Sequence, residues 1–170
     1  RPADAAAYET LVRQTFPTIG TLVLAQYPAS AYPAAWYAYA DLLDDLQFAC
    51  PARAYSRNHA TNGNPTWRYV YTHVIAGPTA LYGAFHGADL ALVFGPLPTA
   101  TPGEADLSAQ VQRQWARFAA NGDPNGGNDP TWPRRLANDD VAIEFDDQRR
   151  GLITDYRQSY CDFWSRYVVF

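Results

Sequence analysis

The chain has 170 residues, of which 48% are hydrophobic and 18% are charged, and its formal net charge is −4. The hydrophobic content excludes a disordered tail, and the acidic balance argues against a nucleic-acid-binding face. No run approaches the roughly 18 apolar residues that a membrane-spanning helix needs. The chain contains no methionine, so we expect a processed product or a piece of a longer protein.

In the N-terminal half, we expect three helices and one strand. Apolar residues at helical spacing predict the first helix over residues 3–15. A second is expected over 34–48. Pro51 is placed to begin a third that ends near 62–65, since proline is accepted in the first turn of a helix. The aromatic and β-branched run over 66–72 is the strongest strand pattern.

The C-terminal half opens with a long irregular segment, residues 76–103, whose prolines include Pro96 and Pro98. Residues 107–121 then give the clearest helical pattern, and Gly122 is placed to end that helix. The apolar stripe of this helix is formed by Val111, Trp115, Phe118 and Ala119.

Two further elements complete the pattern. Residues 141–145 alternate as a short strand, and Asp155 can cap a final helix that runs to about residue 168. Helix dominates this mixed pattern, and the strands are too few for a sheet with two covered faces. Aromatic residues make up 15% of the chain, enough for a larger core, which points to missing neighbouring segments.

One short stretch, GAFHGADL, places His86 between Gly83 and Gly87 in a chain with only three histidines. Two structural interpretations are a turn that contains a histidine and a core histidine bonded to a backbone carbonyl. The functional interpretation is a general base on a loop. The two glycines would permit backbone angles that other residues avoid.

A metal site at His86 and Asp89 is not expected, because one imidazole and one carboxylate fall short of three or four ligands. Asp89 is expected to bond loop backbone or to cap the following turn. The other two histidines belong to separate segments: His59 to an exposed helix and His73 to the end of the strand. Residues 123–129 resemble a calcium loop only superficially, because glycine and arginine stand at ligand positions, so a solvated turn is expected.

Several blocks in order resemble the C-terminal part of the type-B carboxylesterase family, which includes cholinesterases and fungal-type lipases. The blocks are DLQFACP (45–51), WRYVY (67–71), GAFHGADLALVFG (83–95), QWARFA (114–119), NGDPN (121–125) and WP (132–133). The resemblance implies an α/β fold class: residues 1–170 form a single segment, the C-terminal portion of an α/β-hydrolase fold. This segment would hold the last strands of the sheet and their covering helices, and would be incomplete on its own.

The resemblance also implies a role for His86, because a histidine framed as G-A-x-H is the general base of the family's Ser-Glu/Asp-His triad. The imidazole takes a proton from the serine and later gives one to the leaving alkoxide. The substrate would be a small carboxylic ester, and no cofactor is expected.

The remainder of that triad is not found in this chain. The family's nucleophile lies in G-x-S-x-G. None of the serines has glycine both two residues before it and two residues after it. Asp44 and Asp45 are candidates for the acid by residue type only, and no acid is assigned. We therefore expect the nucleophile, the acid and the oxyanion-hole glycines in an N-terminal remainder of the esterase. The 170-residue chain alone should be inactive.

The two cysteines, Cys50 and Cys161, permit one bridge or two buried free thiols. The resemblance favours the bridge, since both positions look like those that pair in the secreted branch of the family. The bridge would close a loop of about 110 residues, which the chain-entropy model values at roughly 4–5 kcal/mol. It would also imply a secreted or extracytoplasmic location.

Two other hypotheses remain. One is a non-catalytic, cholinesterase-like binding or adhesion domain, and the other, ranked last, is a self-contained α+β binding module. Retention of His86 argues against the first, and the ordered blocks argue against the second. A G-x-S-x-G in the preceding sequence, with an acid after it, would distinguish the esterase.

Overall fold

The computed structural model describes residues 1–95, 97, 101–149 and 151–170. Pro96 and Pro98 of the expected irregular segment lie outside the described residues. The chain divides into two compact units: Arg1–Tyr55 with Arg157–Phe170, and Ser56–Tyr156. No helix formed by the described residues is both long enough and apolar enough to cross a membrane.

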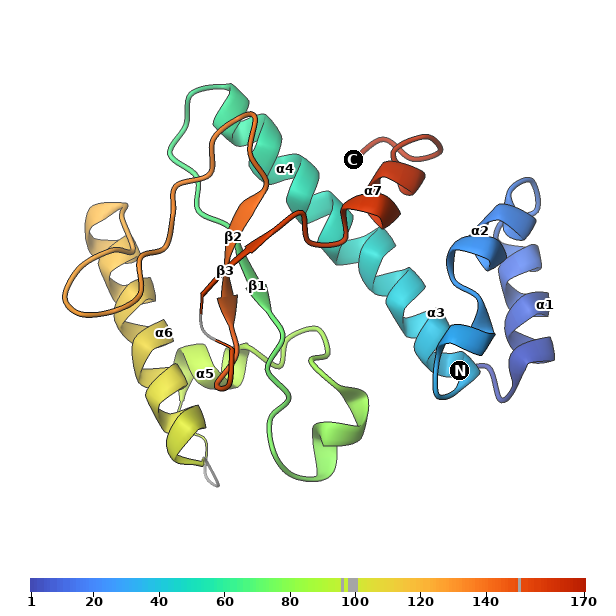
Figure 1. Cartoon of the computed structure of the whole chain (residues 1–170), viewed down its shortest axis with the longest axis horizontal. Helices are drawn as coiled ribbons and strands as arrows, with labels where there is room; N and C mark the ends of the chain where they lie inside the picture. The colour runs from blue at the N-terminus through green and yellow to red at the C-terminus, as the bar shows by residue number, and fades with distance from the viewer. Residues whose placement is uncertain (96, 98–100, 150) are drawn as a thin grey trace. The chain divides into compact units, whose positions relative to one another are not determined.

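The first unit is helical (Figure 1). Its elements are α1 (Ala5–Thr15), α2 (Gly20–Gln26), the 3-10 turn η1 (Ala29–Ala31), α3 (Ala35–Asp44), the π-helical turn η2 (Asp45–Ala49), the start of α4 (Cys50–Thr61), and α7 (Gln158–Trp164). Asp4 caps α1, where its Oδ1 accepts a hydrogen bond from Ala7 N at 2.8 Å. The expected first helix is thus confirmed.

The expected second and third helices are joined. Where a break was predicted, α3 passes through η2 into α4 without interruption. At this point Cys50 N donates to Asp45 O, one residue further back than in an α-helix. Pro51 has no N–H, and its ring would crowd the preceding turn of a regular helix. The wider π turn is consistent with accommodating Pro51 while the helix continues.

Buried aromatic and aliphatic side chains form the core of the first unit. They are Tyr8, Val12, Val23, Tyr27, Ala38, Leu42, Cys50, Cys161 and Trp164. Inside it, Trp164 Nε1 donates to Tyr27 Oη at 2.8 Å. The Tyr27 hydroxyl donates in turn to Asp45 Oδ2, also at 2.8 Å. Every polar group in this chain of hydrogen bonds therefore has a partner, which offsets the cost of burying it.

A disulfide and an ion pair help to hold α7 and the residue before it to the rest of the first unit. Cys50 and Cys161 form a disulfide, with Cα atoms 5.2 Å apart, which confirms the expected bridge. Arg157 pairs with the fully buried Asp45, donating from Nε to Oδ1 at 2.7 Å and from Nη2 to Oδ2. The predicted Asp155 cap is wrong: Arg157 precedes the helix, both residues have positive φ, and no side chain caps α7.

The second unit contains a small sheet and helices packed against it (Figure 1). Its elements after α4 are β1 (Tyr69–Tyr71), the 3-10 turn η3 (Pro78–Tyr82), α5 (Leu90–Phe94), α6 (Pro102–Asn121), β2 (Val141–Phe145) and β3 (Gly151–Thr154). The strand order is β1-β2-β3. Strand β1 runs parallel to β2, with Tyr69 opposite Ile143, whereas β3 is antiparallel to β2.

The core of the second unit lies between α5, α6 and the sheet. It comprises Leu92, Leu107, Val111, Trp132, Ile143 and Phe145. Of the apolar stripe predicted on α6, Val111 is buried and Trp115 is half-buried. Phe118, however, is 50% exposed and Ala119 is exposed. The polar side chain of Gln114 is buried on this helix instead. Its burial is tolerated because it donates a hydrogen bond to Pro130 O at 3.0 Å.

The ends of α6 show why the helix is longer than expected. It begins at Pro102 because Thr101 and Glu104 form a capping box, in which each side chain bonds the other residue's backbone N–H. It ends at Asn121 because Gly122, which follows it, adopts the left-handed conformation with φ 72° and caps the helix, as predicted. The helix therefore extends into the segment expected to be irregular.

Candidate functional site

His86 lies on an exposed loop between η3 and α5 of the second unit. The loop folds back on itself around this residue, because Ala88 N donates to Phe85 O at 3.0 Å. Leu90 N then donates to Gly87 O at 3.2 Å, which leads the chain into α5. The interpretation of His86 as a core histidine is therefore wrong, whereas a histidine presented on a loop is what the structure has.

The two glycines beside His86 are required by the backbone. Gly83 has φ 67° and ψ −153°, a region that is essentially restricted to glycine. Gly87 has φ 85°. A Cβ atom added at Gly83 would meet nothing within 4 Å, so the requirement there comes from the backbone conformation and not from space.

Asp89 does not act as predicted. It occupies the residue before α5, but its side chain caps nothing. Instead, Oδ2 accepts a hydrogen bond from the Tyr69 hydroxyl at 2.8 Å. Burial, together with this hydrogen bond and the charge of Asp89, raises the pKa of Tyr69. The bond connects the end of the His86 loop to β1, a long-range partner that local sequence does not reveal.

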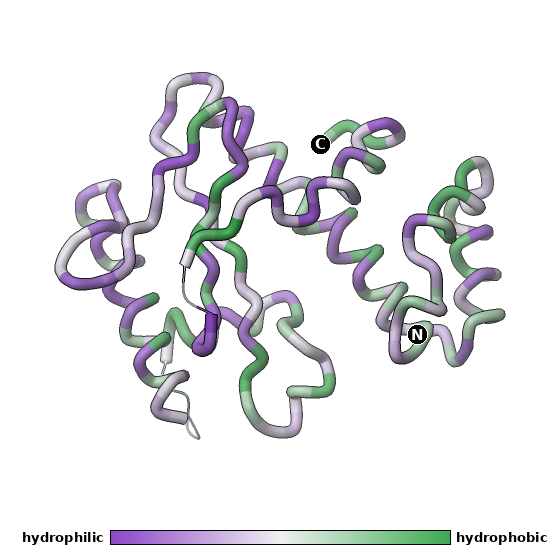
Figure 2. Tube along the Cα trace, viewed as in Figure 1, coloured by the Kyte–Doolittle hydropathy of each residue, from purple (hydrophilic) through white to green (hydrophobic). Residues whose placement is uncertain are grey.

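Large apolar side chains are exposed along the segment that surrounds His86. They are Val74, Leu81, Tyr82, Phe85, Leu90 and Phe94. The tube in Figure 2 has several stretches of hydrophobic colour along this segment. Tyr82 and Phe85 pack edge to face, with ring centroids 6.3 Å apart. The segment that carries His86 therefore exposes several large apolar side chains, two of which pack against each other.

Candidate partners for His86 from this chain have other roles. Ser108 is buried and donates to Leu92 O at 2.8 Å. Asp45 is fully buried within the first unit, where its carboxylate is held by Tyr27 and Arg157. A nucleophile or a triad acid must be able to reach the reacting group, and these contacts occupy both side chains.

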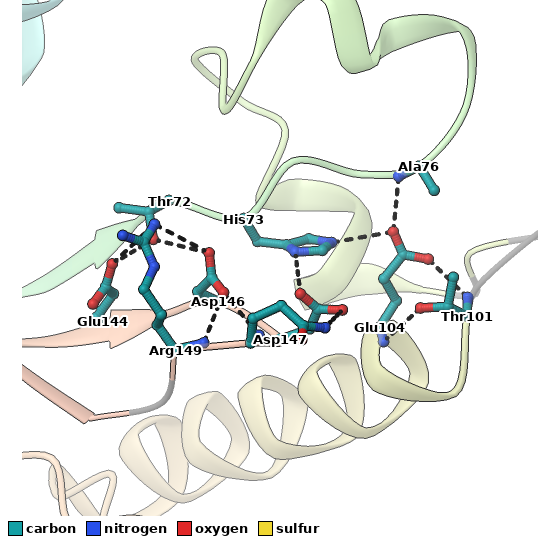
Figure 3. Close-up of polar contacts among 10 residues, drawn as sticks. Thr72, His73, Ala76, Thr101, Glu104, Glu144, Asp146, Asp147 and Arg149 are labelled. Atoms are coloured by element: carbon teal, nitrogen blue, oxygen red, sulfur yellow. Dashed lines mark hydrogen bonds and ion pairs between the residues drawn. The ribbon is translucent and has the colours of Figure 1, made fainter.

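A second histidine, His73, lies in a buried cluster that sequence reasoning missed (Figure 3). It follows β1 closely and is 5% exposed. Its Nε2 is 3.1 Å from Glu104 Oε1, and its Nδ1 is 3.1 Å from Asp147 Oδ1. The capping-box spacing from Thr101 to Glu104 was the one local signal for this cluster, since it marks Glu104 as a helix-start residue.

Glu104 accepts hydrogen bonds on both of its carboxylate oxygens. Its Oε1 also accepts from Ala76 N at 2.9 Å, and its Oε2 accepts from Thr101 N at 2.8 Å. Burial alone would raise the pKa of Glu104, but the hydrogen bonds from Ala76, Thr101 and His73 outweigh it and hold the pKa below its usual value. Glu104 is therefore ionised at neutral pH.

His59 and the expected solvated turn agree with the sequence predictions. His59 is exposed on α4, and its Nδ1 is 2.9 Å from Thr66 Oγ1. Asp123 Oδ1 accepts from Asn125 N at 2.9 Å, which forms a local turn. Among the residues that the structure describes, no group of three or more His, Cys, Asp or Glu side chains is placed to hold a metal ion.

Comparison with known proteins defines the class. The model of the carboxylesterase family matches residues 6–164, which covers both units and includes the His86 loop. The chain therefore belongs to the carboxylesterase family. Its mixed helices and three-stranded sheet are consistent with part of an α/β-hydrolase fold.

Several curated proteins are similar to this chain in sequence. The chain is 29% identical to acetylcholinesterase of Gallus gallus over 136 residues, which are 75% of this chain and 18% of that protein. It is 37% identical to carboxylesterase 1D of Rattus norvegicus over 103 residues, 56% of this chain and 18% of the relative. Cholinesterase of Mus musculus is 28% identical over 134 residues, 73% and 22% of the two chains. The chain thus spans about a fifth of the length of the curated relatives it matches.

Proposed function

We propose that residues 1–170 are the C-terminal segment of a serine carboxylesterase catalytic domain and that His86 is its general base. The observation that carries this proposal is an exposed histidine, on a loop framed by two glycines of positive φ, within a chain matched by the carboxylesterase family. The nucleophilic serine and the acid would lie outside these residues.

In this mechanism the His86 imidazole removes the proton of the serine hydroxyl as the oxygen attacks the ester carbonyl. The imidazolium then gives that proton to the leaving alkoxide, and the same two steps with water release the acid. The exposure of His86 supports this role, because a general base must come within hydrogen-bond reach of the serine.

The disulfide supports a secreted or extracytoplasmic location, since such bridges persist in oxidising compartments. The partner of the chain in this proposal is the N-terminal remainder of the esterase. The exposed apolar side chains of the segment that carries His86 support that arrangement, because exposed apolar groups of this size favour contact with another segment or a ligand.

Hydrolysis of p-nitrophenyl butyrate tests the proposal. The 170-residue chain alone should show no turnover that a serine-directed phosphonate abolishes. In a longer protein that contains these residues after a G-x-S-x-G segment, His86→Gln should lower kcat by roughly a thousandfold or more. His59→Gln is the matched control and should keep wild-type activity.

Two outcomes would refute this assignment. One is phosphonate-sensitive turnover by the 170-residue chain alone, and the other is a longer protein in which His86→Gln retains activity. A longer protein that is folded, lacks hydrolysis and carries glycine or alanine at the serine position would instead favour the non-catalytic, cholinesterase-like binding domain.

A further inference from the structure

The buried cluster around His73 lies at the base of the loop that presents His86. Ala76, whose N–H donates to Glu104, lies in the segment between β1 and α5, three residues after His73. Through the same Oε1 atom, Glu104 contacts His73, which follows β1. A single buried carboxylate therefore joins the end of a strand to the start of the His86 loop (Figure 3).

The cluster is also fixed from the side of α6. Thr101 N donates to Glu104 Oε2, and Thr101 Oγ1 accepts from Glu104 N at 3.2 Å. In the same first turn, a Cβ atom at Gly103 would come within 2.9 Å of Asp147 Oδ2. Glycine at this position thus permits the helix start to approach a carboxylate closely, where the helix dipole favours negative charge.

The His73 ring contacts two carboxylates of the cluster. Glu104 and Asp147 face opposite nitrogens of its ring. One ring therefore bridges two carboxylates that are largely removed from water, and loss of the ring would leave both of them short of a partner.

The far end of the same loop has its own attachment. Asp89, three residues after His86, accepts the hydrogen bond from Tyr69 on β1. Residues 76–89 are thus held at one end by Glu104 of α6 and at the other by Tyr69 of β1, while His86 between them is exposed. The position of an exposed loop depends on such end contacts, because few buried apolar contacts restrain its middle.

From these contacts we infer that Glu104, held by His73, is a positioning residue for His86. It fastens the beginning of the 76–89 segment to the first turn of α6 and so sets where the imidazole is presented. The assignment of His86 as the reacting group rests on the proposed function, whereas the fastening of the loop does not.

Hydrogen–deuterium exchange of the 170-residue chain tests the fastening. Glu104→Gln keeps the size of the side chain but offers one acceptor oxygen and one NH2 group where Glu104 accepts three N–H donors. The single acceptor oxygen of glutamine cannot serve all three donors, so the hydrogen bond from Ala76 N is weakened. Amides of residues 76–89 should therefore exchange about fivefold faster or more in this variant.

Two control variants separate this effect from general loss of stability. Thr101→Val removes the hydroxyl of the capping box but leaves the contacts of Glu104 with His73 and Ala76. Asp129→Asn disturbs a carboxylate paired with Arg113 and Arg117 elsewhere on α6. In both, residues 76–89 should exchange at the wild-type rate. Equal acceleration in all three variants, or none in Glu104→Gln, would overturn the inference.

Imidazole NMR adds a readout at His86 itself. With only three histidines in the chain, Glu104→Gln should shift or broaden the His86 ring signal while the His59 signal stays in place. In the longer, active protein the same variant should lower kcat about tenfold with KM unchanged, consistent with a misplaced catalytic group. If His86→Gln proves harmless there, the proposed function fails, and the exchange experiment still decides the fastening of the loop.

Discussion

At the scale of single residues, Gly83 is the clearest case of a backbone conformation that requires a particular amino acid. Its φ of 67° and ψ of −153° leave other residues strained. We expect Gly83→Ala to lower the free energy of unfolding by about 1–3 kcal/mol, measured by urea denaturation. Gly151→Ala is the control, since Gly151 has no positive φ and a Cβ there meets nothing within 4 Å. Equal losses in both variants would contradict the argument.

The lowered pKa of Glu104 makes the free energy of unfolding depend on pH. The folded pKa of Glu104 is lowered, because the hydrogen bonds from Ala76, Thr101 and His73 outweigh its burial. The stabilisation is therefore present above the unfolded pKa, about 4.3, and is lost as pH falls through the folded value. Glu104→Gln should flatten this acid limb of the stability curve. The measurement is the urea midpoint from pH 7 to pH 3, and an unchanged limb would refute the prediction.

Residues differed in how far the sequence predicted them. The loop position of His86 and the backbone of its two glycines were predicted, because that pattern is local; the role of His86 stays a prediction. The cluster of His73, Glu104 and Asp147 was not, because it joins the end of a strand, a helix start and the turn after β2. No local periodicity encodes that meeting, and it depends on the register of the sheet.

At the scale of elements, the disulfide and α7 are coupled. The bridge connects residues 111 positions apart, and a loop of that length is worth about 4–5 kcal/mol on the chain-entropy model. A Cys50→Ala, Cys161→Ala double variant should lose up to that amount of unfolding free energy. Reductant should lower the urea midpoint of the wild type and leave that of the double variant unchanged. An unchanged wild-type midpoint would show that the bridge contributes little.

The predicted elements were most reliable where periodicity was strong and least reliable where proline and buried polar groups intervened. α1 and β2 follow their patterns closely. Pro51 suggested a break that the π turn avoids, and Gln114 entered the core because it has a hydrogen-bond partner there. Short elements such as α2, α5 and β3 were missed, since a few residues carry too little pattern to distinguish them.

At the scale of the whole molecule, the exposed apolar side chains around His86 favour association. Phe94 is 78% exposed, and apolar patches of this kind promote contacts between copies. We expect the chain to self-associate as its concentration rises, and Phe94→Ser to weaken this in sedimentation velocity. Val169→Ser is the control, because Val169 is 99% exposed near the C-terminus. A monomer at all concentrations would contradict the expectation.

The fold class followed from the ordered motifs more than from the strands, which are few and short. The sequence indicated a mixed helix and strand pattern, and the structure has a three-stranded sheet with helices. The arrangement of parallel β1 beside β2, far apart in the chain, could not be read from local pattern because pairing partners are set by the tertiary fold.

The bridge between Cys50 and Cys161 makes residues 50–161 a covalent ring, and this ring contains all of the unit Ser56–Tyr156. A protease that cuts once in the exposed loop near His86 would open the ring without dividing the molecule. The nicked chain would migrate as one species on a non-reducing gel and as two after reduction. A single cleavage on the loop that presents the imidazole would therefore leave every residue of the chain within one covalent molecule.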